Sequence, residues 1–266
     1  MLERIQKYRR DLHQIPELEL ELPKTQRYLQ EALRDLPCTL SSPTPSSVVA
    51  FFDAGKKESI AFRSDMDALP VTEATGRAFA SRHTGCMHAC GHDGHMAMLL
   101  EFAHQLSTYY KELPHNVVLI FQPGEETPGG AEPMCKSGIF EQYHIKRIFG
   151  FHVWPMLDKG VIATRRNEFM ARSSEVNIDI TGKSAHAAKY QEGIDAMEIA
   201  ARYLLDLYTM EQEELSAETY RLLRFGLLKS GTVRNVVSNA ARMEGTLRAF
   251  QDETYQYMKK RMLELA

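Results

Sequence analysis

The sequence predicts an α/β fold, in which a mixed, mostly parallel sheet with flanking helices is followed by a smaller α+β unit. Short apolar runs typical of buried strands occur at 47–52, 60–63 and 117–121. A helical stripe of apolar residues at 96–106 lies between the second and third runs. This strand–helix–strand order favours a parallel sheet covered by helices. From about residue 171 the order of predicted elements changes to β-α-β-β-α.

The elements of the first unit follow from spacing. Apolar residues recur every three to four positions in 2–12 and again in 28–33, which predicts two helices. Pro16 disfavours helix at the preceding residue and therefore separates them. After the three apolar runs, we expect further strands at 147–151 and 161–164.

The elements of the second unit are equally regular. Residues 176–180 alternate between apolar and polar, which predicts a half-buried strand, and a helix at 194–208 follows. Strands are expected at 220–228 and 241–250. Asp252 can then cap a last helix. One more strand would complete a ferredoxin-like β-α-β-β-α-β unit.

Composition excludes several classes of protein. The 266 residues include 32 Lys+Arg and 35 Asp+Glu, which gives a net charge of −3. This balance gives no general reason to bind nucleic acid or an anionic membrane. No apolar run approaches the roughly 20 residues of a membrane span. The charged N-terminus does not resemble a signal peptide, and four cysteines make no disulfide framework. We therefore expect a cytoplasmic protein.

The densest reactive cluster is CMHACGHDGH at 86–95, with two thiols, three imidazoles and one carboxylate. Such donors suit a zinc-like divalent ion. Cys90 and His92 are the best candidates because they flank Gly91 on the turn before the 96–106 helix. The alternative is a polar turn that carries surface histidines.

A pair of carboxylates, Glu125 and Glu126, follows the predicted strand 117–121. Ligand crevices form at such strand ends in open α/β sheets. One carboxylate could bind a metal while the other moves protons. The alternative is a Gly/Pro-rich surface turn with solvated acids.

Two more polar clusters follow apolar strands. Asp65 and Asp67 come after 60–63, where they could instead cap a turn. His152 lies in the apolar stretch 149–155, where it could instead be a core histidine. Because four such clusters occur between residues 65 and 155, we expect one common site at the strand ends.

Taken in order, these segments resemble the M20 family of metallo-aminoacylases and peptidases. The nearest branch is the amidohydrolase group that includes hippurate hydrolases, auxin-conjugate hydrolases and N-acetyldiaminopimelate deacetylases. The matching segments, between residues 9 and 250, are RRDLHQIPE, RSDMDALP, MHACGHDGH, FQPGEETPGGAEPM, GFHVWP, GKSAHAA and EGTLRAF.

The resemblance implies metal-dependent hydrolysis of the amide bond of small-molecule N-acyl amino acids. Two divalent ions are expected: zinc or manganese, with cobalt or nickel as further options. Cys90 would contact both ions. His92 and His152 would serve one ion and Glu126 the other. Glu125 would be the general base acting on a metal-bound water.

The resemblance also assigns supporting roles. Asp67 matches an aspartate that orients a ligand, and Asp65 stands where many relatives have a metal-binding histidine. His186 matches a lid histidine that reaches the developing oxyanion. Asn235 and Arg248 match positions that grip the substrate carboxylate, for which a guanidinium fork is suited.

Two domains are therefore expected. Residues 1–170 would form the N-terminal portion of the metal-binding catalytic domain. Residues 171–266 would form a ferredoxin-like lid that also makes a homodimer, with its last strand missing. No histidine follows His186, whereas the family has a final metal-binding histidine in a C-terminal part. The alternative is a truncated remnant that binds metal or dimerises without catalysis.

Overall fold

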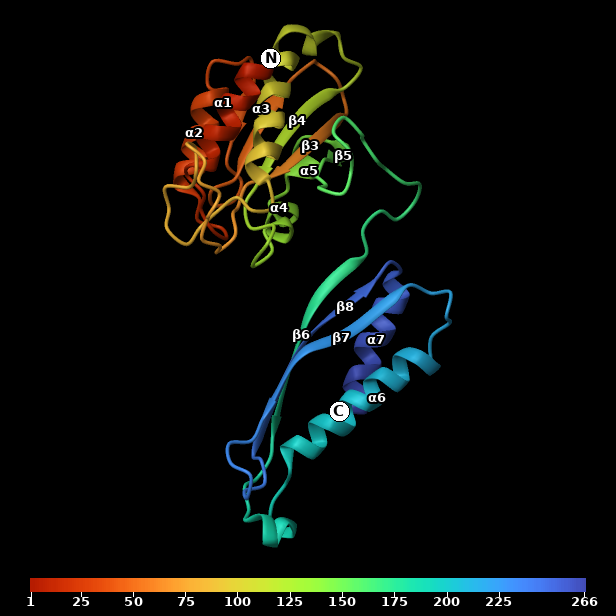
Figure 1. The fold of residues 1–266 in the computed structure, drawn as a ribbon. Helices are drawn as coiled ribbons and strands as arrows, with labels where there is room; N and C mark the ends of the chain where they lie inside the picture. Colours follow the sequence, from red (N-terminus) through yellow and green to blue (C-terminus); the bar gives the residue numbers. More distant parts are fainter. The chain divides into compact units, whose positions relative to one another are not determined.

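The computed structural model describes residues 1–266 and divides into two compact units, Met1–Lys159 and Gly160–Ala266. Each unit combines one β-sheet with helices (Figure 1). No helix of either unit combines the length and the apolar composition that a bilayer crossing requires.

The first unit contains a five-stranded sheet in the order β1-β2-β4-β3-β5. β3 pairs in parallel with both β4 and β5, whereas β2 runs antiparallel to β1 and β4. All strands except β2 therefore run in one direction, which confirms the mixed, mostly parallel sheet. The strands are β1 (Thr39–Ser41), β2 (Val48–Phe52), β3 (Ser59–Asp65), β4 (Asn116–Gln122) and β5 (Ile145–Gly150).

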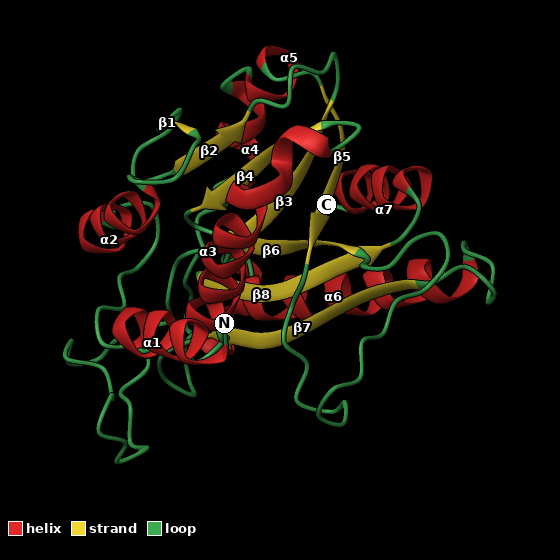
Figure 2. Cartoon of the chain, turned by 90° about the horizontal axis from the view of Figure 1, so that it is seen from above, coloured by secondary structure: helices red, strands yellow, loops and turns green.

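Helices cover both faces of this sheet (Figure 2). In β4, Val117, Leu119 and Phe121 pack with the first three helices, while Val118 and Ile120 pack with the short helices. Burial on both faces explains why β4 is apolar at nearly every position. The helices are α1 (Leu2–His13), α2 (Pro23–Leu33), α3 (His92–Tyr109), the 3₁₀ turn η1 (Tyr110–Glu112), α4 (Ala131–Lys136) and α5 (Ile139–Gln142).

The second unit has an antiparallel sheet in the order β6-β8-β7, with two helices packed on one face. Its element order is the predicted β-α-β-β-α. The Asp195 carboxylate accepts hydrogen bonds from the first turn of α6 and so begins that helix. The elements are β6 (Arg172–Thr181), the 3₁₀ segment η2 (Ala187–Glu192), α6 (Ala196–Glu213), β7 (Arg221–Ser230), β8 (Ala240–Ala249) and α7 (Asp252–Leu265).

Two local predictions are wrong. Residues 161–164 form no strand: Val161 and Ile162 are exposed, and no strand pairs with this segment to take its backbone hydrogen bonds. Asp252 does not cap the last helix but is its first residue. Its carboxylate instead accepts a hydrogen bond from Arg172 Nη1 at 2.7 Å.

Candidate metal centre

Polar residues gather at the carboxyl edge of the first sheet. β3, β4 and β5 run parallel, so their carboxyl ends meet at the same edge. Asp65 ends β3, Glu125 and Glu126 follow β4, and His152 follows β5. α3 begins with His92 in the same group of side chains. The expectation of one site at the strand ends therefore agrees with the arrangement of these residues.

His92 presents a free nitrogen to this group. Its Nδ1 lies 2.7 Å from the carbonyl oxygen of Asp67. A carbonyl oxygen only accepts, so a proton is on Nδ1, and in the neutral imidazole Nε2 carries a lone pair. The side chain is fully buried and Nε2 has no hydrogen-bond partner. Its neighbours are the carboxylates of Asp65 at 3.7 Å, Glu126 at 3.8 Å and Glu125 at 3.9 Å.

His152 and Cys90 form the other side of the candidate centre. His152 Nδ1 donates to the carbonyl of Val153 at 2.7 Å, which leaves a lone pair on Nε2. That Nε2 lies 3.4 Å from the Cys90 sulfur. Potential ligand atoms lie within 4.8 Å of one another in three sets: Cys90, His92 and His152; His92, Glu125 and Glu126; and Asp65, His92 and His95.

These residues fit a divalent cation. The buried Nε2 of His92 needs a partner, and an unpaired buried acceptor is costly. Thiol, imidazole and carboxylate are the donors that zinc and related ions prefer. Glu125 and Glu126 side chains are 41% and 24% exposed, so the centre is open to solvent on their side.

Asp67 organises the turn after β4. Its Oδ1 accepts the backbone N–H of Glu125 and its Oδ2 accepts that of Glu126, both at 2.9 Å. Because the backbone carbonyl of Asp67 also receives His92 Nδ1–H, this one buried residue orients both carboxylates and the imidazole.

The electrostatics are dominated by carboxylates. Burial, followed by the charge of Glu126, raises the pKa of Glu125. Burial and the adjacent Glu126 carboxylate raise the pKa of the Cys90 thiol to about 12. Burial opposes ionisation of Asp65 too, but the hydrogen bond from His95 and nearby cationic groups lower its pKa to about 2. A cation at the centre would favour the thiolate and relieve the repulsion between the carboxylates.

The remaining predicted residues lie in the second unit. His186 and Asn235 are exposed neighbours, because Ala187 N–H donates to the Asn235 carbonyl at 3.0 Å. Arg248 is exposed near the far end of β8 and opposite the buried Met243 face, as predicted. Asn235 lies before Ala240, the first residue of β8, and its bond to Ala187 lies beyond the end where Thr181 pairs with Ala240. A strand rises about 3.3 Å per residue, so β8 alone separates Ala240 from Arg248 by roughly 25 Å, and Asn235 lies past that end within one chain.

Sequence analysis missed two histidines with defined partners. His95 lies three residues after His92 on α3, and its Nδ1 is 2.6 Å from Asp65 Oδ1. His13 joins Asp93 at 2.7 Å and Glu73 at 3.2 Å in a buried network. The helical spacing of the two histidines could have indicated the first contact. No local signal indicated the second, because Glu73 is in an irregular loop.

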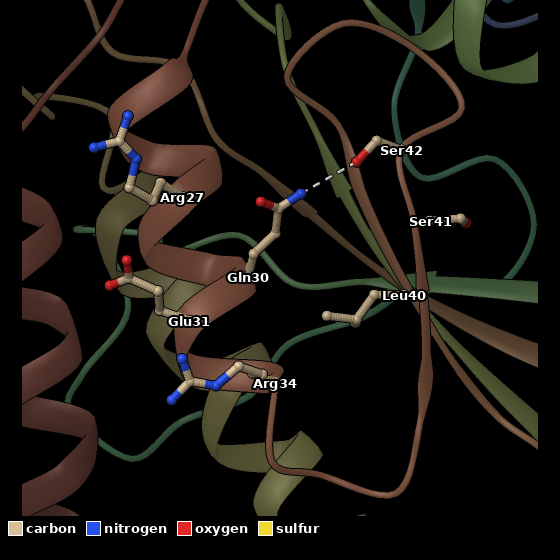
Figure 3. Close-up of a pocket in the computed structure, with 7 residues that line it drawn as sticks. All are labelled: Arg27, Gln30, Glu31, Arg34, Leu40, Ser41 and Ser42. Carbon is tan, nitrogen blue, oxygen red and sulfur yellow. Dashed lines mark hydrogen bonds between the residues drawn. The ribbon is translucent and has the colours of Figure 1, made fainter.

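A separate hollow of about 470 Å³ lies between α2 and β1 (Figure 3). Gln30 Nε2 donates to Ser42 Oγ across it at 3.4 Å. It contains no predicted site residue, so it is not part of the candidate centre. Its lining residues are Arg27, Gln30, Glu31, Arg34, Leu40, Ser41 and Ser42.

Comparison with known proteins identifies the family. The sequence pattern of peptidase family M20/M25/M40 matches residues 61–243. A Staphylococcus epidermidis protein described as an uncharacterized hydrolase is 37% identical over 267 residues, covering 100% of this chain and 70% of that protein. The N-acetyldiaminopimelate deacetylase of Lacticaseibacillus casei is 36% identical over 265 residues, covering 97% and 68%.

Solved structures give the same assignment. A structure from methicillin resistant Staphylococcus aureus has a TM-score of 0.90 at 30% identity, covering 99% of this chain and 68% of that one. A Bacillus subtilis structure, described as a dinuclear metal binding peptidase from the M20 family, has a TM-score of 0.80 at 31% identity, with the same coverage. The chain therefore belongs to peptidase family M20/M25/M40 and is a metallo-amidohydrolase.

Proposed function

We propose that this enzyme hydrolyses the amide bond of N-acyl amino acids, using two divalent ions held by Cys90, His92, His152 and Glu126. The unpaired, buried Nε2 of His92, which faces three carboxylates, carries the proposal. The similarity to the N-acetyldiaminopimelate deacetylase of Lacticaseibacillus casei supports an N-acyl amino acid substrate, and the similarity to the dinuclear metal binding peptidase of Bacillus subtilis supports two metals. Zinc or manganese suits this donor set, and cobalt or nickel would also fit.

Glu125 is the proposed general base. Bound divalent ions supply Lewis acidity, which brings the pKa of water toward neutrality and polarises an amide carbonyl. The Glu125 carboxylate then takes the proton of the attacking water and returns it to the leaving amine. A base works best when its pKa approaches the working pH, and burial, which raises the pKa of Glu125 in the metal-free chain, acts in that direction. Asp67 holds the Glu125 backbone during the transfer.

The same proposal includes a ferredoxin-like lid, homodimerisation and a cytoplasmic location. It also includes the predicted roles of His186, Asn235 and Arg248. The separation of Asn235 and Arg248 favours the dimer. A single carboxylate could be gripped by both residues only if they came from two copies of the chain. Sedimentation equilibrium tests this point, because a chain that stays monomeric at high concentration would contradict it.

Amine release from a pool of N-acetyl and N-benzoyl amino acids tests the activity. The pool includes N-acetyldiaminopimelate, and manganese or zinc is added to the metal-depleted chain. We expect metal-dependent release, which Glu125→Gln lowers by about 10²- to 10⁴-fold. Glu132→Gln, an exposed residue of α4, is the matched control and keeps full activity.

Each failure has a distinct meaning. Unchanged turnover in Glu125→Gln would exclude Glu125 as the base. No release from folded wild-type chain with either metal would exclude amide hydrolysis of these substrates and favour metal binding without catalysis.

A further inference from the structure

His95 differs from His92 because both of its ring nitrogens are already used. Val153 N–H donates to His95 Nε2 at 3.0 Å, so Nε2 must be the unprotonated nitrogen. The proton is therefore on Nδ1, which donates to Asp65 Oδ1 at 2.6 Å. The ring is 3% exposed and has no lone pair left for a metal. His95 is thus no ligand, although one of its ring nitrogens lies within 4.8 Å of potential ligand atoms of Asp65 and His92.

Val153 connects His95 to His152. Its N–H donates to His95, while its carbonyl accepts the Nδ1–H of His152 at 2.7 Å. That second bond leaves the lone pair of His152 on Nε2, 3.4 Å from the Cys90 sulfur. The Val153 side chain also packs on Gly91, where a Cβ atom would lie 2.7 Å from Val153 Cγ2.

Asp65 is itself firmly held. Its Oδ2 accepts Arg63 Nη1 at 2.9 Å, and Arg63 Nε donates to Gln122 Oε1 at 3.0 Å. The carboxylate is 2% exposed. A charged, buried acceptor with two donors keeps the His95 ring in one orientation. The bonds therefore run in one series, from Arg63 through Asp65, His95 and Val153 to His152.

We propose that Asp65 and His95 are positioning residues, which act through the Val153 peptide to hold His152 with its Nε2 lone pair toward Cys90. This gives a role to the aspartate that stands where many relatives have a metal-binding histidine. The hydrogen-bond series belongs to the metal-free chain; only its consequence for metal binding rests on the proposed function.

Two variants of His95 separate the bonds it makes. His95→Gln places an amide oxygen near the position of Nε2 and can still accept Val153 N–H. His95→Asn places an amide nitrogen near the position of Nδ1 and can donate to Asp65, but is too short to reach Val153. Both remove the imidazole, so a general loss of packing affects them alike. His104→Asn, on the same helix, is the matched control outside the series.

Long-range proton–nitrogen NMR of the metal-free chain reads the tautomer of each imidazole. We expect the Nδ1–H tautomer for His95 and His152 in the wild type, with His152 unchanged in His95→Gln and His104→Asn. In His95→Asn, we expect His152 to become a mixture of tautomers. Asp65→Asn should shift His152 in the same direction but less, and it provides a second test if His95→Asn does not fold. A His152 tautomer that none of these variants changes would overturn the proposal.

Titration with cobalt measures the consequence for metal binding. The titration is monitored by the charge-transfer absorption band of a thiolate bound to cobalt. We expect His95→Asn to weaken cobalt binding about 10- to 100-fold relative to His95→Gln. Equal cobalt affinities of His95→Asn and His95→Gln would overturn the proposed effect on metal binding. A wild type that shows the expected tautomers but no thiolate band would instead contradict the Cys90 ligand of the proposed function.

Discussion

Among single residues, Asp67 supports the largest part of the candidate centre. Asparagine at this position keeps one acceptor but turns an N–H₂ group toward a backbone N–H of Glu125 or Glu126. One charge-assisted bond is lost and a donor clash replaces it, which costs about 1–3 kcal/mol. We expect Asp67→Asn to lower thermal stability and to weaken zinc binding, as measured by calorimetry. Asp53→Asn, at an exposed turn, is the control, and equal effects in both variants would contradict the role of Asp67.

The individual residues of the candidate centre were easier to predict from the sequence than the hydrogen bonds that link them. The structure brings Cys90, His92 and His152 together because each stands next to the end of a regular element, and such ends are visible in sequence. The role of His95 could not be predicted, since it depends on a backbone N–H contributed by Val153, 58 residues away in the chain. Backbone donors carry no residue identity, so a pattern of side chains does not reveal them.

At the scale of elements, the start of α3 depends on Gly91. This residue has φ +88°, and an added Cβ would lie 2.7 Å from the Val153 side chain. We expect Gly91→Ala to destabilise the chain by about 1–3 kcal/mol and to weaken metal binding, because the turn between Cys90 and His92 must shift. Chemical denaturation measures the first effect and cobalt titration the second.

Gly94 supplies the matched control within the same helix. Its added Cβ would meet nothing within 4 Å and its φ is ordinary, so Gly94→Ala should be neutral or stabilising by up to about 1 kcal/mol. A Gly91→Ala variant as stable as Gly94→Ala would show that the turn tolerates the shift.

The packing of α1 on α3 includes an ion pair that makes stability depend on pH. Arg4 donates to both carboxylate oxygens of Glu101, at 2.6 and 2.8 Å. The bonds from Arg4 lower the pKa of Glu101 from 4.5 to about 2. A lowered folded-state pKa means that the stabilisation is complete above pH 4.5 and is lost as the pH falls toward 2.

Glu101→Gln should therefore lower stability at pH 7 by about 1–2 kcal/mol, since Arg4 is partly exposed and screened by solvent. The difference from wild type should shrink as the pH falls from 4.5 toward 2. Urea unfolding at a series of pH values measures it, with the exposed Glu31→Gln as control. A stability difference between Glu101→Gln and wild type that stays constant across this pH range would show that the ion pair does not make stability depend on pH.

Helices and strands could be predicted where the order of apolar and polar residues shows which faces of the segment are buried. β4 reads as a continuous apolar run because helices cover both of its faces. Residues 161–164 also form a short, mostly apolar run but have no neighbouring strand, and a strand exists only with a partner. Local sequence therefore predicts strand tendency, whereas pairing decides which tendencies are realised.

At the scale of the whole molecule, all proposed metal ligands lie in Met1–Lys159 and none in Gly160–Ala266. A metal that binds only the folded state stabilises it by about 2.7 kcal/mol at a concentration 100 times its dissociation constant. We expect zinc to slow hydrogen exchange most at the amides of 65–67, 90–95, 124–126 and 150–153, as measured by mass spectrometry. His92→Ala, which removes the ring and its Nε2 without replacing the ligand atom, should abolish this protection. Protection that is equal in both units, or that persists in His92→Ala, would place the metal elsewhere in the chain.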